Sequence, residues 1–516
     1  MDPIELSIFS SRIAAICDEM GAVLRRAAFS PNIKDRLDYS CAVFDPQGEL
    51  CAQAAHIPVH LGSMAYAMRD LVEGFDWLPG NMLILNDPFL GGTHLPDVTL
   101  IAPVFVADRL IGFVANRAHH ADIGAHSPGS MPLSRSLDEE GMVIAPGFLL
   151  IEGRIVEHVL SRITTGTTKP AQARGDFAAQ ISANQTGVLR LSELAAGFGL
   201  SSYLDNVNLL NDYAQRLAAS SLAAIPDGAY EFEDVMDDDG QGQHALRIHL
   251  AMRVSGHQIR LDFSGTAAQV PGNVNCPLAV AAAAVYYVFR CLMPEHIPAC
   301  AGAFRSIQLH APKGSLLNAR RPAAVAAGNV ETSSRVVDVV LGALAGALPG
   351  RIPAASQGSM NNIAMGARGA AGEWDYYETL GGGMGAGPVT PGLSGVHSHM
   401  TNTLNTPVEV LEAAYPVRVR RYAIRRNTGG SGWHRGGDGL LREFEFLADT
   451  QVTLLTERRE FAPWGLQGGA PGCRGENRLN GQLLPGKVSL QVKSGDRLTV
   501  ATPGGGGWGR PGGDGP

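Results

Sequence analysis

The first 28 residues carry apolar side chains at the spacing of an α-helix. Because an α-helix turns once in 3.6 residues, residues three and four apart share a face. We therefore predict a helix over residues 4–28. The residues that this pattern places roughly on one face are Ile8, Ile13, Ile16, Met20 and Leu24.

After this helix the pattern changes several times along the chain. Short apolar runs separated by turn residues predict strands up to about residue 160, and residues 176–225 return to helical spacing. A hairpin with Ser255 and Gly256 at its turn follows, and two Ala/Val-rich helices are expected near 277–292 and 333–348. From about residue 350, glycines divide a series of expected strands.

These elements lack the regular strand–helix–strand alternation of a doubly wound parallel sheet. The pattern therefore predicts a mixed α+β protein, with antiparallel hairpins and a glycine-rich β region in its C-terminal part. At 516 residues, the chain is long enough for more than one hydrophobic core. We expect three regions: a helix with hairpins over 1–175, a helical and α/β region over 176–350, and a mainly β region over 351–516.

One apolar stretch, GGTHLPDVTLIAPVFVADRLIGFVANRAHHAD over residues 91–122, carries polar residues at both ends. Asp108 and Arg109 divide it into two apolar runs and fit the tight turn of a β-hairpin. Folding at that turn brings the two ends together, which explains why the polar residues are concentrated there. Those polar residues are His94, Asp97, His119, His120 and Asp122.

The predicted turn also determines which residues face each other. Asp97 would lie opposite His120, and Val98 opposite His119. Paired strands are about 4.8 Å apart, so His94, Asp97 and one of the two adjacent histidines can meet on one ion. Imidazole and carboxylate ligands suit Zn, Mn or Fe. The alternative is that these histidines are core residues hydrogen-bonded to the neighbouring aspartates.

A second predicted hairpin offers another carboxylate and another imidazole. DPQG, over residues 45–48, is a strong turn signal between SCAVF and ELCAQ. Closing this hairpin brings Asp38 near His56. We expect His56 and His60, in HIPVHLGSM, to face the substrate or to support the metal ligands.

Composition narrows the classes of function. A net charge of −8 argues against nucleic-acid binding, which needs clustered Lys and Arg. The one basic run, RVRRYAIRR over 418–426, alternates as a half-buried strand does, and a phosphate or partner contact is its alternative. The seven cysteines form no CxxC pair, no signal peptide is recognisable, and the apolar stretch from Pro277 is too short to span a bilayer comfortably. A cytoplasmic protein without membrane contact is expected.

Several segments resemble the hydantoinase B/oxoprolinase family. They occur in the expected order and cover nearly the whole chain, which makes the resemblance more specific than any single motif. Among them are NDPFLGGTHLPDVTLIAPVF, HHADIGAHSPGSMP, GNVETSSRVVDVVLGALA, GVHSHMTNTLNTPVEVLE and TPGGGGWG.

The resemblance implies one component of an ATP-dependent hydrolase of hydantoin-, oxoproline- or lactam-type cyclic amides. In this family an A-type subunit, or an N-terminal half, uses ATP to phosphorylate the carbonyl oxygen of the substrate. The B-type chain then completes the reaction at a metal. A hydantoinase A-type ATPase is thus the expected partner, and an A2B2 assembly is our expectation. The chain lacks the P-loop pattern GxxxxGK[ST], so ATP is not expected to bind here.

The resemblance also implies a ligand set for a divalent metal, with Zn, Mn or Fe as the options. A metal held there would lower the pKa of a bound water to about 7. We assign the general base to His120 or Asp122, which lie beside the ligands in the sequence. The positions that match the family's metal ligands are Asp38, His94, Asp97 and His119.

Two further segments are candidates for substrate contact or proton transfer. The glycine-rich loop over 381–403 would let backbone N–H groups approach an anion, and it carries His397, His399 and Asn402. A simple connection whose histidines cap strand ends is the alternative. In LDEEGM, over 137–142, the three acids Asp138, Glu139 and Glu140 offer another proton acceptor or only a solvated turn.

Two other functions are compatible with these residues. One is the core subunit of an ATP-dependent acetone- or acetophenone-type carboxylase, a chain that we expect to be longer. The other is a non-catalytic scaffold for the ATPase partner, which predicts no bound metal. Cyclic-amide hydrolysis is the function that the sequence favours.

Overall fold

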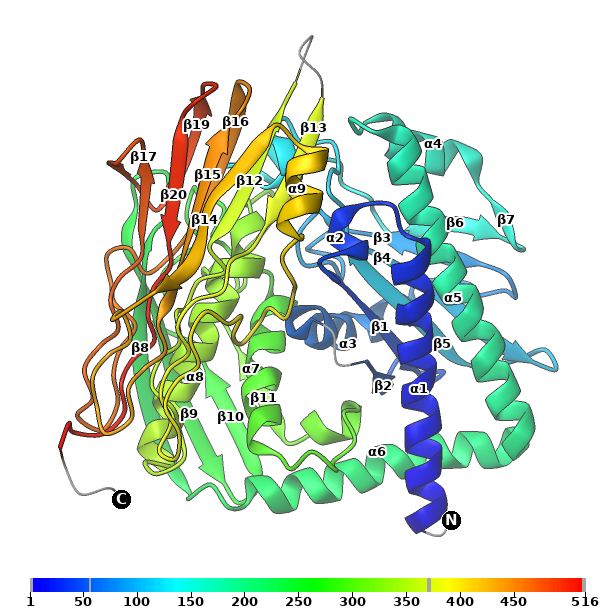
Figure 1. The fold of residues 1–516 in the computed structure, drawn as a ribbon. Coiled ribbons are helices and arrows are strands. Elements are labelled where there is room, and N and C mark those ends of the chain that lie inside the picture. Colours follow the sequence, from blue (N-terminus) through cyan, green and yellow to red (C-terminus); the bar gives the residue numbers. More distant parts are fainter. Residues whose placement is uncertain (1–2, 55–56, 369–372, 513–516) are drawn as a thin grey trace.

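The computed structural model describes residues 3–54, 57–368 and 373–512 (Figure 1). Within these ranges the strands form four sheets, of seven, four, four and five strands. One strand pair, Gln258–Asp262 with Ile307–His310, is parallel, and the strands that build the hairpins are antiparallel. The predicted α+β class with antiparallel hairpins is confirmed.

The N-terminal sheet has the strand order β2-β1-β5-β4-β3-β6-β7. The predicted DPQG hairpin is present, because β1 pairs with β2 in antiparallel fashion around that turn. The strands are β1 (Tyr39–Phe44), β2 (Leu50–Gln53), β3 (Met82–Leu85), β4 (Asp97–Val106), β5 (Arg109–His119), β6 (Gly147–Ile151) and β7 (Arg154–Ile155).

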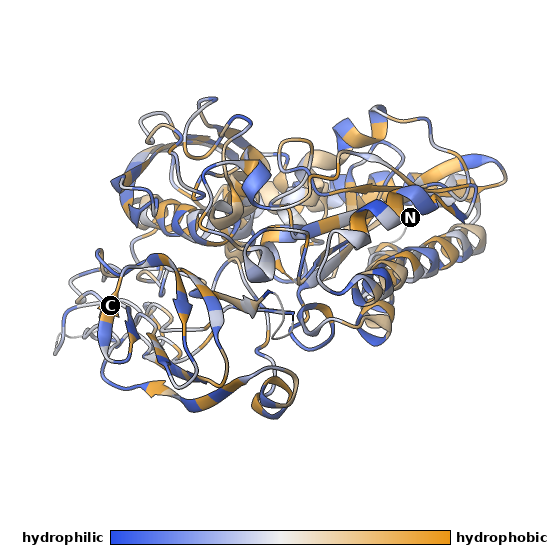
Figure 2. Ribbon diagram, turned by 90° about the horizontal axis from the view of Figure 1, so that it is seen from above, coloured by the Kyte–Doolittle hydropathy of each residue, from blue (hydrophilic) through white to orange (hydrophobic). Residues whose placement is uncertain are grey.

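Helices cover both faces of this sheet. The long helices α1 (Pro3–Ala27) and α5 (Pro170–Phe198) pack on one face, where Phe9 and Phe177 are buried. Helix α3 (Pro58–Glu73) packs on the other face through Met64 and Met68. Figure 2 shows hydrophilic and hydrophobic bands alternating along the helices, as expected when one helix face is buried. Short helices α2 (Pro31–Lys34) and α4 (Glu157–Thr165) complete this part.

The predicted N-terminal helix is confirmed, but one of the five residues predicted on its buried face is exposed. Ile13, Ile16, Met20 and Leu24 are buried, whereas Ile8 is 51% exposed. Phe9, one position along, occupies the buried face instead.

The middle of the chain forms a second layer of helices against a four-stranded sheet ordered β11-β10-β9-β8. Helix α6 (Leu200–Leu222) runs along the base of the molecule in Figure 1 and connects the N-terminal part to this sheet. The predicted hairpin is β9–β10, with Gly256 and His257 at its turn, one residue later than expected. The remaining elements are β8 (Gly228–Asp238), β9 (His244–Ser255), β10 (Gln258–Asp262), β11 (Ile307–His310), α7 (Leu278–Leu292) and α8 (Ser333–Ala347).

The C-terminal part packs two antiparallel sheets around a shared apolar core that includes Phe444 and Val452. The first sheet orders β13-β12-β16-β19, with β12 (Asn362–Ala367), β13 (Trp374–Glu378), β16 (Thr450–Leu455) and β19 (Lys487–Val492). The second orders β14-β15-β20-β17-β18, with β14 (Val417–Arg425), β15 (Gly439–Phe446), β17 (Glu476–Leu479), β18 (Gln482–Leu484) and β20 (Arg497–Ala501). Helix α9 (Val408–Ala414) precedes β14, the strand that contains most of the basic run.

The glycine-rich ending has a packing role in this part of the fold. A Cβ atom built on Gly505 would lie 2.1 Å from the carbonyl oxygen of Met384, and one on Gly436 would lie 2.0 Å from that of Gly505. Backbone segments that are distant in sequence therefore approach each other more closely than any side chain allows. This contact explains why glycine recurs between the C-terminal strands.

Candidate metal centre

The hairpin of β4 and β5 differs from the predicted one in its register. Its turn lies at Ala107 and Asp108, which both adopt positive φ, as a two-residue hairpin turn requires. An irregularity between Val104 and Phe105 then shifts the pairing by one residue. Asp97 consequently pairs with His119, so the predicted pairing of Asp97 with His120 is wrong.

This register determines which of the two adjacent histidines, His119 or His120, faces Asp97. Successive side chains of a strand point to opposite faces of the sheet, so His119 and His120 are directed to different surroundings. The structure gathers His94, Asp97 and His119, with one possible ligand atom from each within 4.8 Å of the others. All three are at most 2% exposed. A buried His–Asp–His group of this kind could bind a metal ion.

Hydrogen bonds at Nδ1 orient both imidazole rings. Nδ1 of His94 lies 3.2 Å from the carbonyl oxygen of Ala326, and Nδ1 of His119 lies 3.1 Å from Oδ1 of Asp97. Nε2 of His119 is buried without a hydrogen-bond partner, and Nε2 of His94 is buried beside a carboxylate oxygen of Asp97, 3.1 Å away. When Nδ1 carries the proton and donates it, Nε2 presents a lone pair, which is the arrangement that metal-binding histidines adopt.

Asp97 is the electrostatic centre of the group. Its Oδ2 lies 3.1 Å from Nε2 of His94 and 3.1 Å from Nε2 of His60. It also accepts a hydrogen bond from the Thr93 hydroxyl at 2.7 Å and one from the Asn329 amide at 3.3 Å. Burial alone would raise the pKa of Asp97, but the surrounding histidines hold it well below its usual range. The carboxylate is therefore ionised, as a ligand must be.

Asp38 lies outside the 4.8 Å group but lines the same pocket. Its Oδ1 is 3.9 Å from Nε2 of His60, and its Oδ2 is 3.8 Å from Nη2 of the buried Arg36. His60 lines this pocket as well, with Nδ1 3.4 Å from the Ser40 hydroxyl. The second predicted hairpin thus delivers Asp38 to the site, and His60 follows at the start of α3.

An aromatic ring from the C-terminal part closes the pocket. Tyr377 of β13 stacks on His119, with ring centroids 4.8 Å apart and planes 12° from parallel. Arg36 lies over the same ring, 4.9 Å from its centroid, and donates to the Tyr377 carbonyl oxygen at 2.7 Å. The pocket is therefore built from residues of all three parts of the chain.

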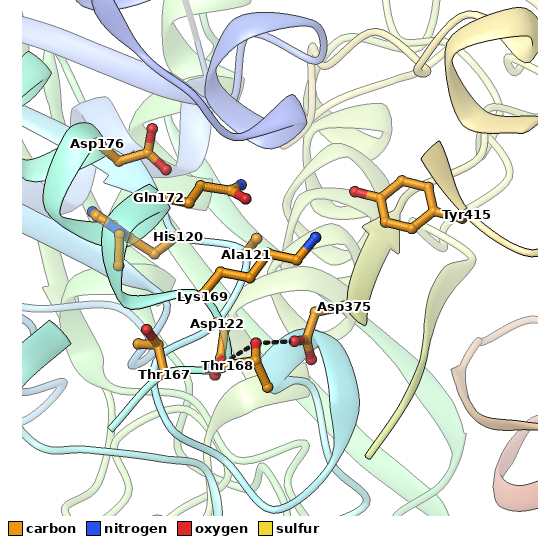
Figure 3. Close-up of a pocket in the computed structure, with 11 residues that line it drawn as sticks. His120, Ala121, Asp122, Thr167, Thr168, Lys169, Gln172, Asp176, Asp375 and Tyr415 are labelled. Carbon is orange, nitrogen blue, oxygen red and sulfur yellow. Dashed lines mark hydrogen bonds between the residues drawn. The ribbon is translucent and has the colours of Figure 1, made fainter. Parts of the chain in front are cut away.

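His120 and Asp122 lie in a different pocket (Figure 3). His120 Nε2 is 2.9 Å from Oε1 of Gln180, and its ring stacks on Phe177 of α5. Asp122 accepts hydrogen bonds from the backbone N–H and the hydroxyl of Thr168, at 2.7 and 2.8 Å. These contacts join α5 and its preceding loop to the sheet. The structure does not bring the two residues predicted as general base to the candidate metal centre.

The glycine-rich loop places its polar residues in a third cavity. His397, His399 and Asn402 line it, whereas Met400 and Thr403 line the metal pocket and Thr401 lines both. The loop therefore runs between the two cavities. His56, the remaining predicted substrate contact, lies outside the described residues.

The three acids of LDEEGM differ in their surroundings. Asp138 and Glu139 are exposed, as in a solvated turn. Glu140 is fully buried, and its Oε1 accepts hydrogen bonds from the Ser134 hydroxyl and from the N–H groups of Val325 and Ala326, at 2.8 to 2.9 Å. Glu140 is thus connected to His94 through the Ala326 peptide, whose N–H bonds to Glu140 and whose carbonyl oxygen lies 3.2 Å from Nδ1 of His94.

Sequence reasoning missed several residues that support the site: Arg36, Ala326, Asn329 and Tyr377. Asn329 lies in the motif GNVETSSRVVDVV, which carries part of the family resemblance, so a signal was present for it. Ala326 acts through its carbonyl group and Tyr377 through a stacking contact from another sheet, and neither leaves a local pattern.

Comparison with known proteins identifies the family. The model of the hydantoinase B/oxoprolinase family matches residues 2–511. 5-oxoprolinase 1 of Arabidopsis thaliana is 41% identical over 98% of this chain, which spans 42% of that protein. A protein of a Pseudomonas species, provisionally named as the B component of a D-/L-hydantoinase, is 30% identical, with 99% of this chain and 90% of that protein covered.

A solved structure supports the same assignment. The ATP-dependent caprolactamase from Pseudomonas jessenii superposes with a TM-score of 0.91 at 27% identity, covering 99% of this chain and 91% of that chain. The chain belongs to the hydantoinase B/oxoprolinase family, as the motifs predicted. In the described part of the chain, no helix has the length and apolarity to cross a membrane.

Proposed function

We propose that this chain is the metal-bearing hydrolytic component of an ATP-dependent cyclic-amide hydrolase. The observation that carries the proposal is the buried His94–Asp97–His119 group, in which Nδ1 of each imidazole faces an acceptor oxygen. Relatives named as a 5-oxoprolinase, a hydantoinase component and an ATP-dependent caprolactamase support this reaction class. The substrate would be a cyclic amide whose carbonyl oxygen carries a phosphate group.

The residues present suit a divalent cation of the Zn, Mn or Fe type. Nε2 of His94, Nε2 of His119 and a carboxylate oxygen of Asp97 are the expected ligands, and Asp38 is the expected fourth. Such an ion supplies Lewis-acid polarisation and acidifies water at the site. Asp97 and the carbonyl of Ala326 would hold the two rings in the tautomers that binding requires.

The other polar residues of the pocket would take part in proton transfer. His60 lines the pocket beside the candidate ligands, so we propose it as the proton acceptor for the attacking water. The positive charge of Arg36 and the negative charge of Asp38 would offset each other beside His60. The predicted general-base role of His120 and Asp122 stays a prediction, and a His120→Ala variant tests it.

The partner in this proposal is a hydantoinase A-type ATPase that makes the phosphorylated substrate, with A2B2 as the expected assembly. ATP would bind the partner and not this chain. Phosphorylation is needed because an amide carbon is a poor electrophile, and a phosphate on its oxygen makes that carbon easier to attack. Membership of the family favours this division of labour.

The decisive experiment purifies the chain with its A-type partner and assays ATP-dependent ring opening of 5-oxoproline, hydantoin and caprolactam. Metal content is measured on the same samples by elemental analysis. We expect about one divalent ion per chain, and in His94→Ala the loss of that ion together with at least a roughly 100-fold loss of turnover. His158→Ala is the matched control, because His158 is exposed on α4.

Two outcomes would replace the proposal. Full ring opening by metal-free protein, or by His94→Ala, would remove the catalytic role of the centre and favour the scaffold function. Incorporation of labelled bicarbonate into product in place of ring opening would favour the carboxylase.

A further inference from the structure

A cavity much larger than the metal pocket adjoins it. This larger cavity has a volume of about 670 Å³, which exceeds the need of a five- or seven-membered ring alone. It lies between α3, α7 and the loop that carries His397 and His399. Because Thr401 lines both cavities, the larger cavity meets the metal pocket at this loop.

The wall at that junction carries polar groups without partners. Both ring nitrogens of His397 and Nε2 of His399 are buried and make no hydrogen bond. The His399 side chain is 9% exposed, and its backbone φ of 60° is one that non-glycine residues rarely adopt. The Tyr287 hydroxyl lies 3.5 Å from Nδ1 of His399, and a carboxylate oxygen of Asp338 lies 3.9 Å from its Nε2.

Burial lowers the pKa of His397 to about 4 and also lowers the pKa of His399. Both rings are therefore uncharged at neutral pH, and each offers one N–H donor. Buried donors without acceptors are rare in folded proteins. An anionic group with several acceptor oxygens would satisfy both of them.

Several other residues that line the larger cavity are apolar and aromatic. Tyr286 and Phe304 stack with ring centroids 4.8 Å apart and planes 24° from parallel, and Leu341 adds an aliphatic surface. Stacked rings present a broad face to a planar or bulky apolar group. The cavity lining therefore offers groups suited to an anion and groups suited to an apolar substituent.

We propose that the larger cavity binds the activated substrate in a defined orientation, with the phosphate group at His397 and His399 and a bulky apolar substituent against Tyr286 and Phe304. The substrate class is then a cyclic amide with an aryl or branched alkyl substituent, activated as its carbonyl phosphate. This proposal rests on the proposed function for the identity of the anion. Its test uses binding alone and requires no turnover.

The test measures binding of phenylphosphonate, methylphosphonate and inorganic phosphate to the full chain by isothermal titration calorimetry. The background is His94→Ala, so that no probe is held by a metal at the candidate centre. Phenylphosphonate should bind about tenfold or more tightly than methylphosphonate, because it also buries an aromatic ring. Phe304→Ala should reduce this preference without changing the affinity for inorganic phosphate.

The double change His397→Gln and His399→Gln should weaken all three probes by about tenfold or more. His257→Gln, at the exposed turn of β9 and β10, is the matched control and should change none. In the otherwise unchanged chain, the double variant should keep the metal content of wild type, which shows that it folds.

Probe binding that disappears in His94→Ala would place the anion on the metal and overturn the proposal. Equal binding by the double variant and its background would also overturn it. If the probes bind as expected while no cyclic amide is opened, the subsite stands and the proposed function fails.

Discussion

Among the three buried side chains of the candidate centre, His94 owes its geometry to groups that are not expected ligands. The Ala326 carbonyl oxygen fixes His94, and Glu140 fixes the peptide N–H groups of Val325 and Ala326. Asp97 has a double role, because it is a candidate ligand and also the hydrogen-bond partner of His119. Changes one contact away from the centre should therefore alter metal affinity.

Glu140→Gln tests this dependence directly. Gln keeps the shape and the acceptor oxygen of Glu140 but cannot ionise, so its hydrogen bonds to the backbone should be weaker. We expect a fall in metal affinity of about 10- to 100-fold, measured by competition with a chelator. Glu139→Gln, on the exposed neighbour, should leave the affinity unchanged.

Glu140→Gln should also change how the free energy of unfolding depends on pH. Burial raises the pKa of Glu140 from 4.5 to about 7. Between these values the folded chain keeps a proton that the unfolded chain loses, so the stability of wild type falls as pH rises from 4.5 to 7. The fall is absent below 4.5, complete above 7, and about 3 kcal/mol in total.

Because glutamine does not titrate, Glu140→Gln should lack this fall. Its free energy of unfolding should rise relative to wild type by up to about 3 kcal/mol between pH 4.5 and 7. Urea unfolding of metal-free protein measures the difference. Parallel pH profiles for the two proteins would show that Glu140 titrates normally in the folded state.

At the scale of elements, α3 is held close to α7 by the absence of a side chain. A Cβ atom on Gly62 would lie 2.5 Å from the Cα of Ala283, so Gly62→Ala must push the two helices apart. We expect a loss of about 1–3 kcal/mol of unfolding free energy. The control is Gly197→Ala in α5, where nothing lies within 4 Å of the added methyl group.

Gly197→Ala should stabilise the protein by about 0.5–1 kcal/mol, because alanine favours the helix more than glycine does. Thermal unfolding of both variants gives the comparison. Stabilisation of equal size in the two variants would mean that helix propensity, and not the contact between α3 and α7, sets the effect at Gly62.

The elements were predictable from the sequence where one periodicity persists, as in α1, α7, α8 and the β4–β5 hairpin. The hairpin's register was not, because it depends on a turn and an irregularity that shift the pairing by one residue. That single residue decided whether His119 or His120 reaches Asp97. The ligand set came from the family resemblance and the hairpin together. The contacts of His94 with Ala326 and of His119 with Tyr377 join segments more than 200 residues apart, and no local sequence pattern marks Ala326 or Tyr377.

At the scale of the whole molecule, Arg36 ties the N-terminal part to the C-terminal sheets. It is fully buried, donates to Tyr377 and lies 3.2 Å from the Thr379 hydroxyl. Arg36→Met would leave the acceptors on β13 and the Asp38 carboxylate without this partner. We expect a loss of about 3 kcal/mol or more in unfolding free energy, measured by urea titration.

Arg190→Met is the matched control for Arg36. Arg190 joins α5 to Glu19 of α1 at the surface, where solvent weakens the ion pair. Its replacement should change stability very little. If both variants lose similar stability, Arg36 has no special role in joining the parts. The division into regions 1–175, 176–350 and 351–516 stays a prediction.

Two hydrogen bonds at the candidate centre each link residues 232 positions apart. One joins His94 to Ala326 and the other joins Asp97 to Asn329. A fragment ending before residue 320 would contain every candidate ligand, yet it would lack both contacts that hold the ligands in place. The fraction of chains that bind metal would therefore report how many chains have packed residues 94–97 against residues 326–329. Metal binding and the packing of these two segments would then be thermodynamically coupled.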